Sequence, residues 1–325
     1  MSDRRKSLLQ QAAMQIRTAN NLLLACHMRP DADALGSLLA LMLGLEHLGK
    51  KVEAVSPDGV PEVYRFLPHW QRLRTKAQAP PDLAIGMDAD GSHRLGGAEA
   101  DILGAPLVIN LDHHTGSDPY GHIQVIDRTA AATGELVFEL LLLLDVPITE
   151  DIANCLMAAI LTDTGTFRFS NVTPETFRIA SALVEAGAHP TPIHEAVYGK
   201  RSFAVTQLLG RLLTGIQRSE DGKVVWGCLT QPDFQALGLA TSDTEGFVDQ
   251  IRMVDGGEVA LFFREERSGE IRVSLRSRGN VNVAKVSEQF GGGGHVPAAG
   301  CSLFAPLAEA VERVLAAVNQ EIQGA

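Results

Sequence analysis

The sequence predicts an α/β protein with two domains, in which a doubly wound, mainly parallel sheet is joined by a helical linker to a smaller α/β domain. Its 325 residues, 45% of them apolar, are enough for two cores, because a single core stops growing at roughly 250 to 300 residues. Short apolar runs alternate with amphipathic stretches in the first half, which is the rhythm of parallel βαβ units. A new series of strands begins after the turn at Asp221 and Gly222. We therefore predict a first domain over 1–195, a linker over 196–220 and a second domain over 221–325.

Four short apolar runs in the first half predict the strands of the parallel sheet. Strands of such a sheet are buried on both faces, so they are apolar throughout instead of alternating with polar residues. The runs cover residues 22–26, 52–55, 83–87 and 107–111. A helix over 33–48 is predicted to connect the first two strands.

The region from residue 133 to 218 is predicted to be nearly all helical. Thr133 and Thr149 each precede acidic residues and are candidate N-caps, and prolines separate the segments that follow. The apolar stretch between Thr133 and Leu144 either packs inside the first domain or forms the interface of a homodimer. The pattern leaves both possibilities open.

The second domain is predicted to mix strands and helices within roughly a hundred residues, a usual domain size. Its expected strands cover 224–229, 259–264 and 271–275, and its expected helices cover 283–290 and 307–322. The block GGGGHVPAAG lies between the two helices and is interpreted as a glycine loop.

Composition excludes several classes of protein. The net charge of −11 argues against holding long nucleic acid, because such binding depends on many phosphate contacts. A polyanionic substrate should therefore be short. Four cysteines stand singly in apolar surroundings, as small core residues do, without a pair suited to zinc or redox chemistry. The sequence shows neither an apolar run of about 20 residues nor a signal-peptide pattern, so we expect a cytoplasmic protein that does not enter a membrane.

The segment LLLACHMRPDADALGS places polar side chains between a buried strand and a helix. His27, Asp31 and Asp33 lie there, at the edge of an open α/β sheet where ligands bind. The two carboxylates can diverge toward neighbouring ions, and His27 can reach one of those ions. The alternative is structural: Asp33 caps the helix and His27 is an ordinary core histidine.

Other element ends in the first half carry the same residue types. Asp88 follows the third strand, Asp112, His113 and His114 follow the fourth, and Asp163 ends an apolar helix where its charge opposes the helix dipole. Imidazole and carboxylate without cysteine favour Mn²⁺, with Mg²⁺, Fe²⁺ or Co²⁺ possible, over structural zinc. Two such ions about 3.5 to 4 Å apart suit in-line displacement at phosphorus. The residues therefore predict a dinuclear phosphoesterase.

The second domain supplies positive charge beside the glycine block. Arg272 shares a strand face with Ser274 and Arg276, and the glycines expose backbone N–H groups that an anion can approach. The alternative is a flexible turn beside a solvated strand. No GK[ST] follows the glycines, so nucleoside triphosphate binding is not indicated.

Taken together, HMRPDAD, MDAD, LDHH, TDTGTF and GGGGHVPAAG resemble the DHH phosphoesterase superfamily, in the branch that carries a C-terminal DHHA1 domain. The resemblance covers nearly the whole chain and is greatest to the nanoRNase and pAp phosphatase group. It implies two metal ions that share Asp88 as a bridge. The implied ligands are His27, Asp31 and Asp88 for one ion, and Asp33, Asp88, His113 and Asp163 for the other.

The same resemblance implies roles for the remaining residues. His114 would contact the scissile phosphate, Asp112 would orient neighbouring ligands, and hydroxide between the ions would be the nucleophile. The residues implied to hold the terminal phosphate or base of the substrate are Arg276, Ser277, Gly293, Gly294 and His295.

The expected function is Mn²⁺-dependent hydrolysis of very short 5′-phosphorylated oligoribonucleotides to mononucleotides, together with hydrolysis of pAp to AMP. Cyclic dinucleotides or their linear products are an alternative substrate, because the same metals could serve them. A non-catalytic nucleotide sensor is an alternative of another class, and it would lack one or more ligands. The resemblance does not extend to RecJ-type exonucleases, since the chain is acidic and shows no room for a further nucleic-acid-binding domain.

Overall fold

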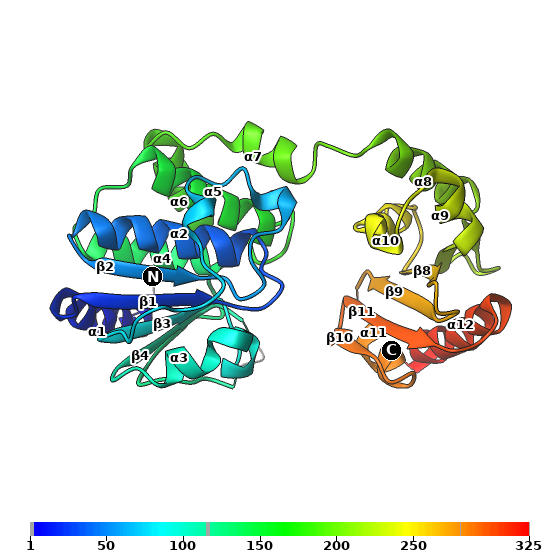
Figure 1. Cartoon of the computed structure of the whole chain (residues 1–325). Coiled ribbons are helices and arrows are strands. Elements are labelled where there is room, and N and C mark those ends of the chain that lie inside the picture. The colour runs from blue at the N-terminus through cyan, green and yellow to red at the C-terminus, as the bar shows by residue number, and fades with distance from the viewer. Residues whose placement is uncertain (1–2, 115–117, 280, 325) are drawn as a thin grey trace. The chain divides into compact units, whose positions relative to one another are not determined.

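The computed structural model describes residues 3–114, 118–279 and 281–324. The chain divides into two compact units, Met1–Lys200 and Arg201–Ala325 (Figure 1). Among the residues described, none of the helices combines the length and the apolar character that crossing a lipid bilayer requires.

The first unit contains a sheet of five parallel strands in the order β2-β1-β3-β4-β5, which confirms the predicted α/β fold. The strands are β1 (Asn21–Cys26), β2 (Lys51–Val55), β3 (Leu83–Met87), β4 (Val108–Asp112) and β5 (Ile123–Ile126). Strand β5 was not predicted, because this four-residue edge strand includes the exposed Gln124 and gives no long apolar run.

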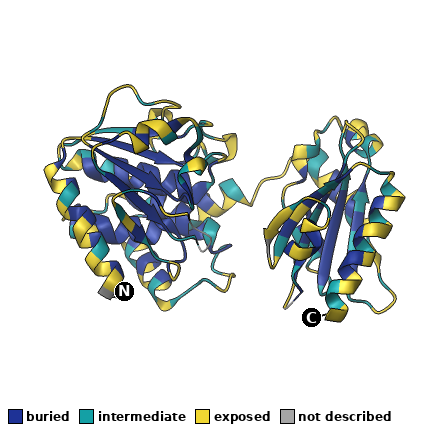
Figure 2. Cartoon of the chain, turned by 90° about the horizontal axis from the view of Figure 1, so that it is seen from below, coloured by how far each residue is buried: buried dark blue, intermediate teal, exposed yellow. Residues whose placement is uncertain are grey.

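Alternate side chains of β1 enter two different cores. Leu22 and Leu24 pack against α1 (Asp3–Thr18), α2 (Ala32–His47) and α4 (Thr133–Leu143). Leu23 and Ala25 pack on the opposite face with α3 (Glu99–Leu103). Figure 2 shows the strands as a buried layer between these helices. Helix α1 was not predicted, because polar side chains separate the residues that it buries.

Helix α2 is covered on both sides, which explains why its sequence is apolar almost throughout. One side faces the sheet, and the other packs on α5 (Glu150–Asp163). A Cβ added at Gly36 would lie 2.3 Å from the carbonyl oxygen of Cys155, so the two helices approach too closely for any larger residue there. Helices α6 (Pro174–Glu185) and α7 (Pro190–Val197) pack on α5.

Two of the predicted helix caps were wrong and one was confirmed. Thr149 accepts a hydrogen bond from Ile152 N and caps α5 as predicted. Thr133 lies inside the first turn of α4, whose N-cap is Ala132, and its hydroxyl group donates to Asp88. Asp31, not Asp33, caps α2 by accepting from Ala34 N. Helix α4 is buried from Thr133 to Leu141, so its apolar sequence is explained by packing inside the first unit.

The second unit contains a mixed sheet of six strands in the order β10-β11-β9-β8-β7-β6. Strands β7 and β8 are parallel, and the other neighbours are antiparallel. The strands are β6 (Gln217–Arg218), β7 (Val224–Leu229), β8 (Val259–Glu265), β9 (Ile271–Ser277), β10 (Gly293–His295) and β11 (Ala298–Leu303).

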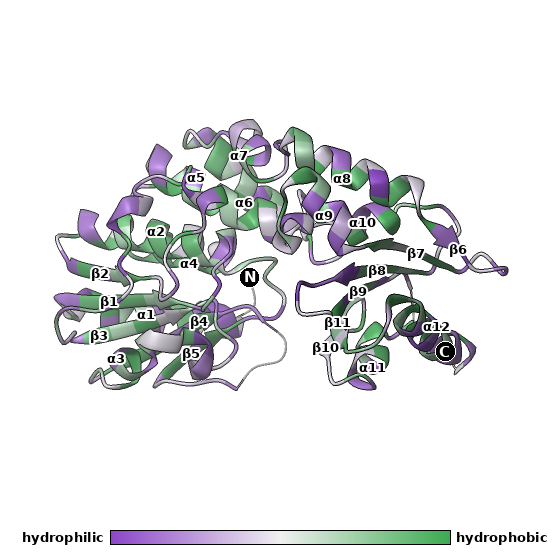
Figure 3. Ribbon diagram, turned by 45° about the vertical axis from the view of Figure 1, so that its right-hand side comes forward, coloured by the Kyte–Doolittle hydropathy of each residue, from purple (hydrophilic) through white to green (hydrophobic). Residues whose placement is uncertain are grey.

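Helices pack on both faces of this second sheet. One face carries α11 (Val283–Glu288) and α12 (Leu307–Gly324). Part of the other face carries α8 (Phe203–Thr214), α9 (Gln231–Leu237) and α10 (Phe247–Ile251). Hydrophobic and hydrophilic residues alternate along α8 (Figure 3), and Leu208 and Leu212 are buried in the second unit. The domain limits at 195 and 220 stay predictions.

Short 3₁₀ helices complete the described structure at Glu62–Tyr64, Trp70–Arg72, Ser92–Ala98 and Thr241–Thr244. The cysteines are free. Cys26, Cys155 and Cys301 are buried and Cys228 is half-buried, as their apolar surroundings predicted.

Candidate metal centre

The carboxyl ends of three neighbouring parallel strands bring the predicted ligands of the first unit together. His27 follows β1, Asp88 follows β3, and His113 follows β4. Because these strands run parallel and side by side, their following residues meet at one edge of the sheet. Potential ligand atoms lie within 4.8 Å of one another in three groups: His27, Asp31 and Asp88; Asp33, His113 and Asp163; and Asp88, His113 and His114.

Asp88 faces two of these groups with different oxygens. Its Oδ2 lies 3.4 Å from His27 Nε2, and its Oδ1 lies 3.6 Å from His113 Nε2. The residue has a φ of 54°, a left-handed backbone conformation that residues other than glycine seldom adopt. Such strain is often kept where it aims a functional side chain. Asp88 is buried and has the geometry of a bridging carboxylate.

All three histidines hold one ring nitrogen in place and leave the other available. Nδ1 of His27 lies 2.7 Å from the carbonyl oxygen of Met28, and Nδ1 of His113 lies 3.3 Å from that of Ala130. Nδ1 of His114 lies 2.7 Å from Asp112 Oδ1. Since these oxygens accept, Nδ1 is the donor and Nε2 is presented as the ligand or contact atom, as in many metal sites.

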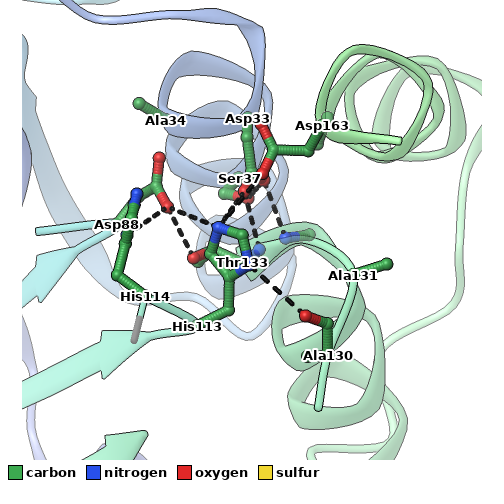
Figure 4. Close-up of polar contacts among 12 residues, drawn as sticks. Asp33, Ala34, Ser37, Asp88, His113, His114, Ala130, Ala131, Thr133 and Asp163 are labelled. Atoms are coloured by element: carbon green, nitrogen blue, oxygen red, sulfur yellow. Dashed lines mark hydrogen bonds and ion pairs between the residues drawn. The ribbon is translucent and has the colours of Figure 1, made fainter. Parts of the chain in front are cut away.

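Asp33 and Asp163 approach His113 from two helices (Figure 4). His113 Nε2 lies 3.1 Å from Asp163 Oδ2 and 3.6 Å from Asp33 Oδ2. Asp163 is the last residue of α5, where the helix dipole disfavours a negative charge. Asp163 therefore lies at the helix end that the sequence predicted, and a cation between these groups would offset the unfavourable charge.

The cluster concentrates negative charge, and its Asp33 and Asp88 carboxylates are buried. Burial, together with the charges of Asp88 and Asp163, raises the pKa of Asp31 to about 6. Burial also raises the pKa of Asp33 well above its usual value. Burial alone would lower the pKa of His113, but its contact with Asp163 and the charge of Asp33 raise that pKa to about 11. The carboxylates thus favour a positive charge beside them.

The donor set fits a hard or borderline divalent ion. Each group combines at least one carboxylate with an imidazole and contains no thiolate, which suits Mn²⁺, Mg²⁺, Fe²⁺ or Co²⁺. Asp88 could serve both sets at once, because its two oxygens point apart.

Asp112 lies beside these groups but outside them. The side chain is fully buried, and Oδ1 accepts from the backbone N–H groups of His113 and His114 at 2.9 and 3.2 Å. The His114 side chain is 40% exposed, so its free edge reaches solvent. The pair combines a buried anchor with an accessible imidazole.

Sequence reasoning missed the donors that hold the carboxylates. Asp33 accepts from Thr133 N, Gly134 N and Ser37 Oγ, and Asp88 accepts from Thr133 Oγ1. The signal that could have revealed them is the Thr133-Gly134 pair at the start of an apolar helix, where glycine is unfavourable unless space or contact requires it.

The register of the second sheet aligns part of the predicted substrate-binding set. Arg276 pairs with Ala298, which pairs with His295, so the three backbones form one row across β9, β11 and β10. The side chain of His295 lies outside the described residues. Arg276 Nε lies 3.2 Å from Asp249 Oδ1. Ser277 is buried and donates to the carbonyl oxygen of Val296. Because successive side chains of a strand point to opposite faces, Ser277 lies on the other face of β9 from Arg276.

The glycine block forms a hairpin, so its interpretation as a loop was wrong. Gly293 and Gly294 belong to β10, which pairs with β11. At Gly294 φ is +146°, and an added Cβ would lie 2.5 Å from Ala298 O. Strand β10 contains no β-branched residue, so it gave no strand signal. Its glycines allow close strand approach.

A pocket of about 390 Å³ lies next to this hairpin. It includes Gly293 but not Arg276, Ser277 or Gly294. The residues that line it include Arg264, Arg272, Ser274, Ser302 and Gly291. Of the face inferred from β9, Arg272 and Ser274 therefore border this pocket and Arg276 does not.

Comparison with known proteins identifies the family. The family model described as the DHH family N-terminal domain matches residues 21–160, and the DHHA1 domain model matches residues 234–324. The bifunctional oligoribonuclease and PAP phosphatase NrnA of Thermus thermophilus is 36% identical over 303 residues, which cover 92% of this chain and 89% of that protein. The chain belongs to the DHH phosphoesterase family. It is accordingly a metal-dependent phosphoesterase.

Other relatives agree with this placement. The protein of the same name from Bacillus subtilis is 28% identical over 291 residues, 88% of this chain and 90% of that protein. The crystal structure of an exopolyphosphatase-related protein from Bacteroides fragilis superposes on this DHH-family chain with a TM-score of 0.88 at 24% identity, covering 97% and 96% of the two chains. That structure shares the fold.

Proposed function

We propose that this DHH-family enzyme hydrolyses very short 5′-phosphorylated oligoribonucleotides to mononucleotides, and pAp to AMP, with two divalent ions, preferably Mn²⁺. The observation that carries the proposal is Asp88, whose Oδ2 faces His27 at 3.4 Å while Oδ1 faces His113 at 3.6 Å. Relatives from two bacteria named as bifunctional oligoribonuclease and PAP phosphatase support the choice of substrates.

Two ligand sets follow from this arrangement. His27, Asp31 and Asp88 would hold one ion, and Asp33, Asp88, His113 and Asp163 would hold the other. When bound, the ions would supply a nucleophile from water near neutral pH and neutralise charge that develops on the phosphate oxygens. The chain contributes carboxylates that are already held in position, so these groups do not have to reorient during the reaction.

His114 would contact the scissile phosphate, and Asp112 would hold it for that contact. The 2.7 Å hydrogen bond between Asp112 Oδ1 and His114 Nδ1 leaves Nε2 directed away from the anchor. Asp112 also raises the pKa of His114 through this hydrogen bond. A protonated Nε2 would donate to a phosphate oxygen, and such a hydrogen bond between charged groups is stronger than one between neutral groups.

The second unit would bind the far end of the substrate. Arg276, Ser277, Gly293, Gly294 and His295 are the proposed contacts for a terminal phosphate or base. Arginine suits phosphate because its guanidinium can donate two parallel hydrogen bonds. The net charge of −11 supports a short substrate over a long polyanion.

The test is a series of 5′-phosphorylated RNAs from two to about twenty nucleotides, with pAp and cyclic di-AMP alongside, in Mn²⁺ and in chelator. We expect turnover to peak at two to four nucleotides and to vanish in chelator. Equal or faster turnover of long strands contradicts the proposal. A strong preference for cyclic di-AMP would make the enzyme a cyclic dinucleotide phosphodiesterase, and binding without turnover would make it a sensor.

A further inference from the structure

The first turn of α4 contacts the carboxylates of both Asp33 and Asp88. Thr133 Oγ1 donates to Asp88 Oδ1 at 2.8 Å. The backbone N–H groups of Thr133 and Gly134 donate to Asp33 Oδ2 and Oδ1 at 2.7 and 2.9 Å. Two consecutive residues therefore hold the carboxylate of Asp33 in α2 and that of Asp88, which follows β3. Figure 4 labels Thr133 and both carboxylates.

These contacts are buried, away from solvent. Asp33 and Thr133 are 0% exposed, and Asp88 is 2% exposed. Helix α4 has no side-chain cap of its own, because its N-cap residue is Ala132. Asp33 of α2 supplies the acceptor that the free N–H groups at a helix start require. The helix start and the carboxylate therefore satisfy each other.

The hydrogen bonds are distributed unequally over the Asp33 carboxylate. Oδ1 accepts from Gly134 N and from Ser37 Oγ, the latter at 3.0 Å, whereas Oδ2 accepts from Thr133 N alone among the described residues. A carboxylate oxygen has two lone pairs, so Oδ2 keeps one available. Oδ2 is also the oxygen that lies 3.6 Å from His113 Nε2. The turn therefore leaves acceptor capacity on the side that faces His113.

Gly134 gives the turn the space to approach. A Cβ added there would lie 2.7 Å from the Ala159 Cβ in α5 and 3.5 Å from Asp33 Oδ1. Any larger residue would push the start of α4 away from α5 and crowd the carboxylate. The close packing of three helices sets the position of the N–H donors.

We propose that Thr133 is a positioning residue of the metal centre. Its hydroxyl group selects the Asp88 oxygen that faces His113, and its N–H group orients Asp33 toward the same histidine, before any ion binds. This inference rests on the proposed two-ion site. Mutating a residue that hydrogen-bonds to a metal ligand typically lowers the affinity for the metal by about 10- to 100-fold.

Mn²⁺ binding to the full chain without substrate tests the proposal, with free Mn²⁺ measured by electron paramagnetic resonance. Thr133→Val removes the hydroxyl at nearly constant volume and should weaken Mn²⁺ binding about tenfold or more. Thr133→Ser keeps the hydroxyl and should bind close to wild type. Thr176→Val is the control, because Thr176 of α6 is also buried and donates at 2.7 Å to Glu135 of α4, and neither residue belongs to the ligand groups.

Wild-type affinity in Thr133→Val overturns the inference, as does an equal loss in Thr133→Ser or Thr176→Val. If Thr133→Val does not fold, Gly134→Ala provides the second test, since its methyl group displaces the same N–H donors and should also weaken Mn²⁺ binding. Wild-type affinity in Gly134→Ala would then refute positioning by this turn. Asp88→Ala separates the two proposals: if it binds Mn²⁺ like wild type, the two-ion function fails, whereas unchanged binding in Thr133→Val alone rejects only the role of Thr133.

Discussion

Asp112 and His114 are joined by a hydrogen bond of 2.7 Å between Oδ1 and Nδ1. The same oxygen accepts the backbone N–H groups of His113 and His114. One buried carboxylate therefore sets both the orientation of the His114 ring and the path of the chain that carries the two histidines. Anchoring a histidine in this way fixes the nitrogen that carries the proton.

We predict that Asp112→Ala lowers kcat by about 10- to 100-fold, because His114 loses the contact that orients it. Asp112→Asn should retain more activity, since its amide oxygen can still accept from Nδ1. Steady-state rates on a 5′-phosphorylated dinucleotide measure the difference. Equal activity in wild type and Asp112→Ala would contradict the orienting role.

Asp88→Ala should abolish turnover and reduce the number of Mn²⁺ ions bound, because both ligand sets lose an oxygen. Equilibrium dialysis with metal analysis counts the ions, and the length-series assay measures the rate. The control is Asp101→Ala, which removes an exposed carboxylate from α3. Turnover at the wild-type rate in Asp88→Ala would reject the dinuclear mechanism.

Arg276→Ala should raise the KM for short oligonucleotides and leave kcat nearly unchanged. A hydrogen bond to a charged group contributes about 1.5 to 3 kcal/mol, so the KM should rise by about tenfold or more. Arg267→Ala, in the exposed turn between β8 and β9, is the matched loss of one positive charge. A similar rise in both variants would indicate a general effect of charge instead of a specific contact.

Gly36→Ala should destabilise the first unit by about 1 to 3 kcal/mol, the usual cost of overpacking a core. The added methyl group would lie 2.3 Å from the Cys155 carbonyl oxygen, and backbone cannot move aside as a flexible side chain does. Gly210→Ala in α8 is the control, because an added Cβ there meets nothing within 4 Å. Scanning calorimetry should show a lower transition temperature for Gly36→Ala only.

The buried thiols of Cys26 and Cys155 and the half-buried thiol of Cys228 should resist alkylation at pH 8. Burial raises the pKa of Cys26 to about 12 and that of Cys228 to about 11, and it raises the pKa of Cys155 as well. A raised pKa keeps each thiol neutral at pH 8, and the thiolate is the reactive form. Mass spectrometry after brief labelling should find these residues unmodified in the folded protein and modified in guanidinium chloride. Rapid labelling of Cys26 in the folded protein would disagree with its burial.

The sequence predicted elements whose apolar pattern is continuous, such as β1 and β3, because burial on both faces requires such runs. It did not predict β5 or α1, since Gln124 and the polar residues of α1 interrupt the pattern. The sequence also predicted that His27, Asp88 and His113 lie close together, because the residues that follow neighbouring parallel strands meet at the same edge of the sheet. The contacts of Thr133 could not be predicted, since they join it to Asp33 and Asp88, which lie 100 and 45 residues away in the chain.

Helix α2 carries Asp33 within a segment that has almost no side facing solvent. A helix enclosed between a sheet and α5 cannot shift its register or tilt to suit a different ion without reopening the core on two sides. Variation in metal preference among descendants of this chain should therefore accumulate in the connections after β1, β3 and β4. Those connections can change length and composition, while the helix stays nearly constant.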